Sequence, residues 1–330
     1  MAKIVLGLAT SHTPLFTLHS DDWQLRADAD RMNPRLNLSD GRRLRYEELL
    51  AEVSPKYAEA SQQEELARKA ALCEAALDHL AKALAQARPD VVVVVGDDQG
   101  ELFSPSNQPA IAICHNDTLI TSDAFGREGS PDWVVKAGKG YLMDARHALP
   151  GHTQFALALI HGLVDQGVDV TAVADSGKDD KDGLGHAFGF IAKRLYGGLS
   201  IPMVPILLNT YFPPNVPTAA RCHDIGLRLR EVIEADTSSL RVAIVASGGL
   251  SHFVVDEALD RSVMAALSSQ DQSVLRNLPR CALNSGSSEI LNWVLTAGAM
   301  KGTPVTWSEY LPLYRTPAGT GVGAGFAIWQ

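Results

Sequence analysis

The sequence predicts a single α/β domain with a central, largely parallel or mixed sheet that is covered by helices on both faces. Short apolar runs rich in β-branched residues recur along the chain, as in "DVVVVVG" at 90–96. Such runs are typical of strands that are buried on both faces. Helical patterns alternate with these runs, which is the order of an α/β fold. No low-complexity linker or 20–50-residue repeat divides the 330 residues.

The apolar runs and periodic segments assign the individual elements. Strands are predicted at 3–9, 90–96, 109–114, 169–174, 202–209 and 241–247. Helices are predicted at 62–87, 152–166, 218–235 and 257–269. Long polar segments at 17–45, 116–150 and 175–185 are expected to be loops that bind ligands or cover a site. The C-terminal segment, about 283–330, is expected to pack over the body of the domain or a partner subunit.

Composition and charge exclude several classes of protein. The formal net charge is −9, which argues against a nucleic acid or an anionic membrane surface as partner. No apolar run approaches the ~20 residues that span a bilayer, and "MAKIVLGLAT" lacks the features of a signal peptide. The four cysteines form no CxxC pair, so neither a disulfide scaffold nor a zinc knuckle is indicated. We therefore expect a cytoplasmic protein with reduced thiols.

Polar residues follow several of the predicted strands. His12 follows the first strand, 97–99 ("DDQ") the second, and "SGGLSH" the last, ending at His252 with Glu257 just beyond. His186 lies in the loop motif "GHAFG". Each could be a turn or capping residue. Ligands of open α/β sheets bind beyond the carboxyl ends of strands, so the shared location favours a functional site.

These side chains limit the chemistry. Neutral imidazoles and carboxylates that leave coordination positions open suit non-haem Fe(II), whereas structural zinc would need more sulfur or histidine. A histidine that does not bind the metal can accept a proton near neutral pH. From the residues alone, the ligand histidines cannot be separated from a base.

Six motifs together resemble the class III extradiol ring-cleavage dioxygenases. They are "SHTP", "VVVGDDQGELF", "GHAFG", "ASGGLSHFVVDEALDR", "SGSSEILNW" and "YRTPAGTGVGAGFAIW". This is the superfamily of the protocatechuate 4,5-dioxygenase catalytic subunit, and the gallate and 3-O-methylgallate dioxygenases are the most similar type. The resemblance implies an Fe(II) enzyme that uses O₂ to open a catecholic or trihydroxylated aromatic ring. It also implies a homodimer or higher homo-oligomer, and some relatives need a small partner subunit.

The resemblance assigns three metal ligands: His12, Gln99 and Glu257. Gln99 stands where the family pattern Val-Tyr-Asn-Asp-His has its second histidine, so an amide oxygen would replace an imidazole. Oxygen ligands bind divalent iron less firmly than imidazole, which predicts weaker iron binding. The alternatives for this ligand are the Asp98 carboxylate and another histidine, His147 or His152.

The resemblance also assigns an acid–base pair. His252 would take a proton from a ring hydroxyl as the diol binds, and His186 would bond a substrate hydroxyl or the bound oxygen. A carboxylate on the ring would require a cation in the pocket. Candidates for substrate binding are Asp98, His152, Tyr211 and Arg315.

Other classes of function were compared with this prediction. A dinucleotide-binding oxidoreductase would need GxGxxG and a serine hydrolase would need GxSxG, and the chain has neither at the relevant strand ends. The strongest alternative is a superfamily member that has lost its iron chemistry and acts as a metal-poor small-molecule binding protein. The Gln99 substitution supports this alternative, whereas the presence of both His186 and His252 favours an enzyme.

Overall fold

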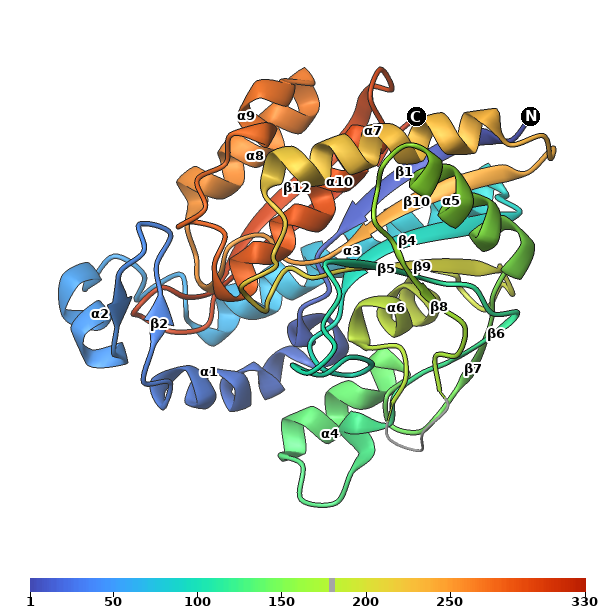
Figure 1. Cartoon of the computed structure of the whole chain (residues 1–330). Helices are drawn as coiled ribbons and strands as arrows, with labels where there is room; N and C mark the ends of the chain where they lie inside the picture. Colours follow the sequence, from blue (N-terminus) through green and yellow to red (C-terminus); the bar gives the residue numbers. More distant parts are fainter. Residues whose placement is uncertain (178–181) are drawn as a thin grey trace.

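The structure is a computed structural model that describes residues 1–177 and 182–330 (Figure 1). Residues 178–181, which belong to the predicted 175–185 loop, lie outside the described residues. Within the described residues, nine strands form one mixed sheet. Its parallel centre has the order β1 (Lys3–Thr10), β10 (Arg241–Ser247), β4 (Val91–Asp97) and β9 (Met203–Leu208).

Antiparallel pairs extend this centre on both sides. Beyond β9, β5 (Ile111–Cys114) runs antiparallel and is followed by β8 (Thr171–Val173). Beyond β1, β13 (Thr320–Trp329) runs antiparallel and also pairs with β11 (His252–Val254) and β12 (Val305–Tyr314). The last part of the C-terminal segment, residues 305–329, therefore belongs to the sheet itself.

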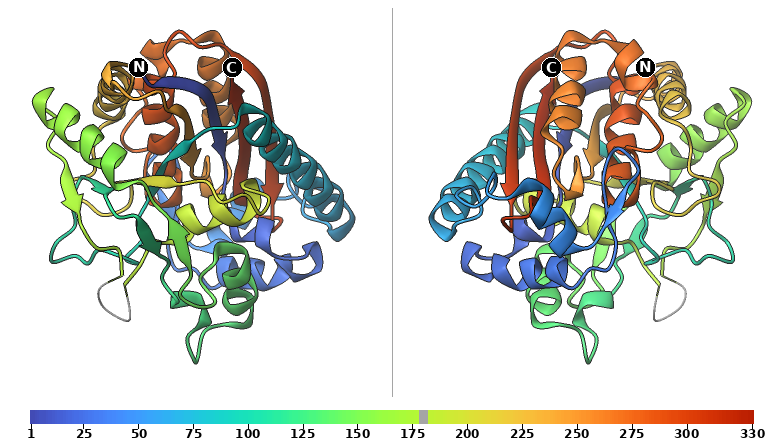
Figure 2. Two further views of the ribbon diagram at one scale, coloured as in Figure 1. Left: turned by 90° about the vertical axis from the view of Figure 1, so that its right-hand side faces the viewer. Right: turned by 90° about the vertical axis from the view of Figure 1, so that its left-hand side faces the viewer.

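Helices pack on both faces of the sheet (Figure 2). One face carries α3 (Gln63–Ala87) and α6 (His186–Phe190), and the other carries α5 (Thr153–Asp165), α7 (Ala219–Ala235) and α10 (Ile290–Ala299). The valine run of β4 serves both faces, because alternate side chains of a strand point in opposite directions. Val91, Val93 and Val95 pack in one core, and Val92 and Val94 pack in the other. The predicted fold class is thus confirmed.

The predicted strands and helices are all present, with ends that shift by at most two residues. The segments predicted as loops contain short elements of their own. These are η2 (Ser20–Asp22), α1 (Trp23–Arg31), β2 (Leu36–Asn37), β3 (Arg43–Leu44), β6 (Thr118–Ile120), η3 (Ala124–Gly126), α4 (Asp132–Gly138), η4 (Lys139–Tyr141) and β7 (Ala148–Pro150). α1 is anchored because Trp23 is buried and its indole N–H donates to the Leu15 carbonyl at 3.0 Å.

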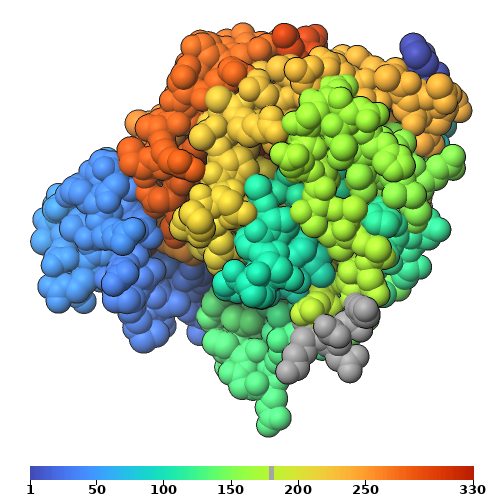
Figure 3. All heavy atoms as spheres, viewed as in Figure 1, coloured from blue at the N-terminus to red at the C-terminus, as the bar shows by residue number. Residues whose placement is uncertain are grey.

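The remaining α-helices of the described residues are α2 (Tyr46–Val53), α8 (Glu257–Ser269) and α9 (Gln272–Arg276). In the space-filling view, the blue segment that contains α1 and α2 projects from the left of the body, and the green segment around α4 projects below it (Figure 3). None of the helices in the described ranges combines the length and apolar character needed to cross a membrane.

Candidate active site

The carboxyl ends of the central strands open into a cavity of about 350 Å³. Several polar side chains in the cavity wall come from the loops after the strands and from the starts of two helices: His12, Gln99, Glu101, His186, His252 and Glu289. Arg26 from α1 and Trp133 from α4 contribute to its lining from the two projecting segments. The cavity therefore lies where the sheet topology predicts a ligand site, and segments 17–45 and 116–150 both contribute to it.

His12 is buried and its tautomer follows from its neighbours. The Ser247 hydroxyl donates to the Ala187 carbonyl at 2.7 Å, so its oxygen accepts a hydrogen bond from His12 Nδ1 at 2.9 Å. The proton of a neutral His12 is therefore on Nδ1, and Nε2 carries a lone pair. This Nε2 lies 3.1 Å from Glu289 Oε2 but makes no hydrogen bond within the described part of the chain.

Glu289 is a central residue of the site that the sequence predictions missed. It ends the short helix η6 (Ser285–Glu289), directly before α10. Its Oε2 accepts the Gly249 N–H at 2.5 Å, and its Oε1 accepts the Gln99 amide at 3.1 Å. Burial by itself raises the pKa of Glu289, but the neighbouring His252 and His12 lower this pKa well below its ordinary value.

Gln99 joins two buried carboxylates. Its Nε2 donates to Asp97 Oδ2 at 3.0 Å as well as to Glu289 Oε1. Burial and the adjacent Glu289 raise the pKa of Asp97, as expected for two acids brought together in a site of low polarity. The part of Gln99 that faces the acids is thus the NH₂ group, which cannot bind a metal. This orientation does not agree with the prediction that the amide oxygen of Gln99 is a metal ligand.

His186 lies at the start of α6 and is held by Glu101. Its Nδ1 lies 2.6 Å from Glu101 Oε1, and the other oxygen of Glu101 accepts the Gln99 N–H at 2.5 Å. Burial acts against the charged form, but Glu101 raises the pKa of His186 to about 9. Gly96 permits this placement, since a Cβ there would lie 2.8 Å from the Cβ of Ala187.

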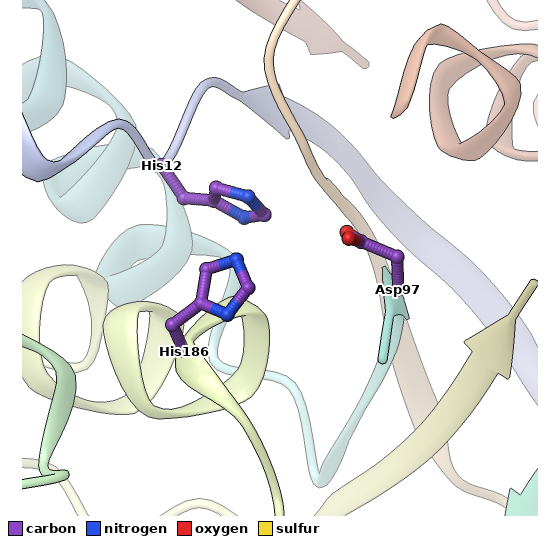
Figure 4. Close-up of side chains that lie close together, drawn as sticks. All are labelled: His12, Asp97 and His186. Atoms are coloured by element: carbon purple, nitrogen blue, oxygen red, sulfur yellow. The ribbon is translucent and has the colours of Figure 1, made fainter. Parts of the chain in front are cut away.

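His12, Asp97 and His186 form a possible metal-binding group. One potential ligand atom from each lies within 4.8 Å of the others, and the three side chains face one another (Figure 4). His12 Nε2 also supports a metal site at this position. It is buried without a hydrogen-bond partner among the described residues, and a cation would bind its lone pair. Two imidazoles and a carboxylate, with Glu289 next to them, form a donor set that fits a non-haem divalent metal.

His252 lies on the other side of the Glu289 carboxylate. Its Nδ1 donates to the Leu250 carbonyl at 2.8 Å, and its Nε2 lies 3.2 Å from Glu289 Oε1. Burial lowers the pKa of His252, but Glu289 outweighs this effect and the pKa is raised. Gly286 leaves room for the ring, because a Cβ there would overlap it. His252 is therefore fixed at one nitrogen and can exchange a proton at the other.

Glu257 is not brought to this cavity. Its carboxylate accepts the Tyr314 hydroxyl at 2.6 Å and pairs with Arg261 at 2.7 Å. The side chain is 37% exposed and lines a different surface depression, together with Asp256 and Tyr57. Although Glu257 follows "SGGLSH" closely in sequence, the start of α8 places it away from His12. Its predicted role as a metal ligand does not fit this position.

Asp98 and His152 have local structural contacts. The Asp98 carboxylate accepts the backbone N–H groups of Gly100, Leu102 and Phe103, which closes the loop after β4. His152 caps α5 by accepting the Phe155 N–H at 3.2 Å. Neither residue lines the cavity, so their predicted contact with substrate is not supported by their positions.

His147, the other alternative for the second metal ligand, pairs with Asp144 at 2.9 Å and is also absent from the cavity wall. Tyr211 and Arg315, the other predicted substrate-binding residues, do line the cavity. Burial raises the pKa of the Tyr211 phenol to about 12, so this hydroxyl keeps its proton at neutral pH.

Comparisons with known proteins identify the family of the chain. The chain is 44% identical to gallate dioxygenase from Pseudomonas putida over 57 residues, which is 17% of this chain and 16% of that protein. The aligned region is thus a small part of either protein. The family described as the catalytic LigB subunit of aromatic ring-opening dioxygenase matches residues 51–326, which confirms the resemblance seen in the motifs. The chain therefore belongs to the LigB catalytic-subunit family of aromatic ring-opening dioxygenases.

Proposed function

We propose that this protein is an Fe(II)-dependent extradiol dioxygenase that opens a catecholic or trihydroxylated aromatic ring of the gallate, methylgallate or protocatechuate type. The observation that carries the proposal is the lone pair on His12 Nε2. This atom is buried, faces Glu289 at 3.1 Å and has no hydrogen-bond donor among the described residues. An arrangement of this kind is stable when a cation lies between the groups.

The metal would be held by His12 and His186 together with one or both of the buried carboxylates, Asp97 and Glu289. Ser247 and Glu101 would orient the two imidazoles through their Nδ1 atoms, as outer partners of metal ligands generally do. When bound, ferrous iron supplies Lewis acidity and a place where the diol and O₂ meet. In this proposal, His186 is a ligand rather than the acid–base group that the motif predicts.

His252 would remove a proton from a ring hydroxyl. Its Nδ1–H is bound to Leu250, so Nε2 is the atom that accepts the proton. The negative charge of Glu289, 3.2 Å away, stabilises the imidazolium that forms. Phe125, Trp133 and Phe253 line the same cavity and would contact the faces of the ring.

The proposal is tested by loading the full-length protein anaerobically with Fe(II) and measuring iron per chain after desalting. Gallate, 3-O-methylgallate and protocatechuate are then added with O₂, and oxygen uptake is recorded together with the absorbance of the ring-opened product. We expect about one iron per chain and equimolar consumption of O₂ and substrate. An iron-loaded protein that consumes no O₂ with any of these compounds would refute the proposed reaction.

A matched pair of variants tests the metal site separately. His12→Ala should lose iron, because it removes the orphaned nitrogen. His19→Ala should keep iron, because the His19 side chain is exposed and pairs with Asp21. If the wild-type protein takes up no iron but still binds aromatic acids, the result would favour the metal-poor binding protein that the Gln99 substitution suggests.

We further propose that the protein acts in the cytoplasm as a homodimer or higher homo-oligomer. This follows from the resemblance and from the expected reduced thiols. Light scattering of the purified chain measures the oligomeric state, and a monomer at micromolar concentration would contradict it.

A further inference from the structure

Two arginines share one aspartate beside the cavity. Arg315 Nε donates to Asp30 Oδ2 at 2.7 Å, and Arg315 Nη2 donates to Asp30 Oδ1 at 3.1 Å. Arg26 Nη1 donates to the same Asp30 Oδ1 at 2.9 Å. Arg315 and Asp30 are almost fully buried, at 3% and 1% side-chain exposure, and Arg26 is 14% exposed. This cluster therefore carries a net charge of about +1 in a region that excludes most water.

The unsatisfied part of the cluster is one edge of the Arg26 guanidinium. Only Nη1 of Arg26 has a hydrogen-bond partner among residues 1–177 and 182–330, so Nε and Nη2 are unbound there. These two nitrogens form the edge that grips a carboxylate with parallel hydrogen bonds. Arg315 uses the same edge to hold Asp30. Both arginines line the cavity.

Aromatic rings hold the Arg26 guanidinium in place. Its central carbon lies 4.9 Å from the centre of the Phe253 ring and 5.5 Å from that of the Trp133 ring. Contacts of this kind orient a guanidinium without occupying its N–H donors. Burial and the adjacent Arg315 together lower the pKa of Arg26 to about 10, against the opposing effect of Asp30. The cation is thus only partly compensated by the protein itself, which is costly in a buried position.

We propose that Arg26 binds the anionic substituent of the substrate through its Nε–Nη2 edge, and that Arg315 and Asp30 are positioning residues that hold Arg26 in place. The site would select single-ring aromatic acids that carry one carboxylate. This inference depends on the proposed function for the statement that the bound ring is the one that is opened. The anion site itself depends only on the contacts of Arg26.

Size and charge agree with this class of ligand. A volume of about 350 Å³ lies at the lower end of the range for ligand pockets, which suits one substituted ring. The cavity wall also carries the carboxylates of Glu101 and Glu289, which would repel an anion. The carboxylate of the ligand would therefore turn towards Arg26, and the opposite edge of the ring would face His12 and His252.

The test is an equilibrium binding measurement that does not require catalysis. Benzoate and its neutral isostere benzamide are titrated into the full-length protein without added iron, in the presence of a chelator, by calorimetry or by fluorescence of the cavity tryptophan. The wild-type protein should bind benzoate at least about tenfold more tightly than benzamide, because charge-assisted hydrogen bonds are involved. Arg26→Gln should abolish the preference, and Arg26→Lys, which keeps the charge but not the planar edge, should retain part of it.

Arg31→Gln is the matched control. Arg31 is on the same helix, is exposed and pairs with Asp28, so its variant should keep the wild-type preference for benzoate. Equal affinity of the wild-type protein for benzoate and benzamide, or an unchanged preference in Arg26→Gln, would overturn the inference. If the preference depends on Arg26 but no ring is opened, the anion site stands and the proposed function fails. If rings are opened without any preference for benzoate, the proposed function stands and the anion site fails.

Discussion

Replacing Glu289 and Glu257 separately with glutamine tests which glutamate belongs to the metal site. The Glu289 carboxylate accepts the Gly249 N–H on one oxygen and the Gln99 amide on the other. A glutamine side chain has only one acceptor oxygen, so in either orientation its NH₂ group faces one of these two donors. Glu289→Gln should therefore lose one hydrogen bond and leave a buried donor unpaired, at a cost of about 1–3 kcal/mol. With an unfolding entropy of about 2.1 cal/mol/K per residue, the melting temperature of a chain of this length should fall by roughly 1–4 °C.

The effect on iron should be larger. Loss of an outer partner of a metal ligand typically weakens metal binding by about 10–100-fold. Removal of a carboxylate that faces His12 Nε2 at 3.1 Å should cost at least about 100-fold. Glu257→Gln removes a partly exposed ion pair with Arg261, which is worth about 0.2–1 kcal/mol, and it should leave iron binding unchanged.

Both variants are loaded with Fe(II) under anaerobic conditions, desalted and assayed for iron per chain with a colorimetric chelator. Calorimetric melting of the metal-free proteins measures stability independently. We expect little iron in Glu289→Gln and about one iron per chain in Glu257→Gln. Stoichiometric iron in Glu289→Gln would remove this residue from the ligand set. Loss of iron in Glu257→Gln would show that Glu257 belongs to the metal site and would contradict its placement away from the cavity.

Three further substitutions address the neighbouring residues. His252→Ala should retain iron but lower kcat by about 10²–10⁴-fold, because it removes the proposed base; an unchanged kcat in steady-state assays would rule out that role. Glu101→Gln should weaken iron binding by about 10–100-fold, because His186 loses its orienting carboxylate; anaerobic iron titration measures this, and wild-type affinity would contradict it. Gln99→Leu should destabilise the metal-free protein by about 1–3 kcal/mol, because two buried carboxylates lose their shared donor. Thermal melting should show a smaller loss with iron bound, and an equal loss in both states would disprove the bridging role.

Strands could be predicted where burial of both faces requires an apolar residue at every position. The valines of β4 are apolar at every position because both faces of the strand are covered, and this pattern is visible without a structure. β13 was not assigned as a strand, because Gly321, Gly323 and Gly325 are typical of turns and loops. The structure explains these glycines by close packing, since a Cβ at Gly321 would overlap the Leu313 carbonyl oxygen. Such a constraint comes from neighbouring residues in the fold, and although the three glycines recur at every second position, they lack the β-branched or aromatic side chains that indicate a strand.

The site could be predicted in part for a similar reason. His12 and His252 follow the ends of central strands, so the topology alone brings them to one edge of the sheet. Glu257 was chosen because it is near His252 in sequence, but β11 leads the chain into α8, away from the cavity. Glu289 arrives from a different part of the chain. Its signal is a single acidic residue directly before the wholly uncharged helix 290–299, which indicates a buried and paired carboxylate.

The acids and the arginines around the cavity impose opposite electrostatic demands on a ligand. At the strand ends, Asp97 and Glu289 are already close enough for burial and their mutual repulsion to raise the pKa of Asp97. A ring hydroxyl that lost its proton there would add a third negative charge, which is unfavourable at low polarity unless a cation is also present. Arg26, by contrast, carries an incompletely compensated positive charge. A catecholic acid whose hydroxyls keep their protons could bind through its carboxylate in the proposed orientation without a metal, but loss of a hydroxyl proton would require a metal. This distribution of charge therefore predicts two results. The ligand should bind to the metal-free protein in a way that depends on Arg26, and its hydroxyl should lose a proton only after metal is added.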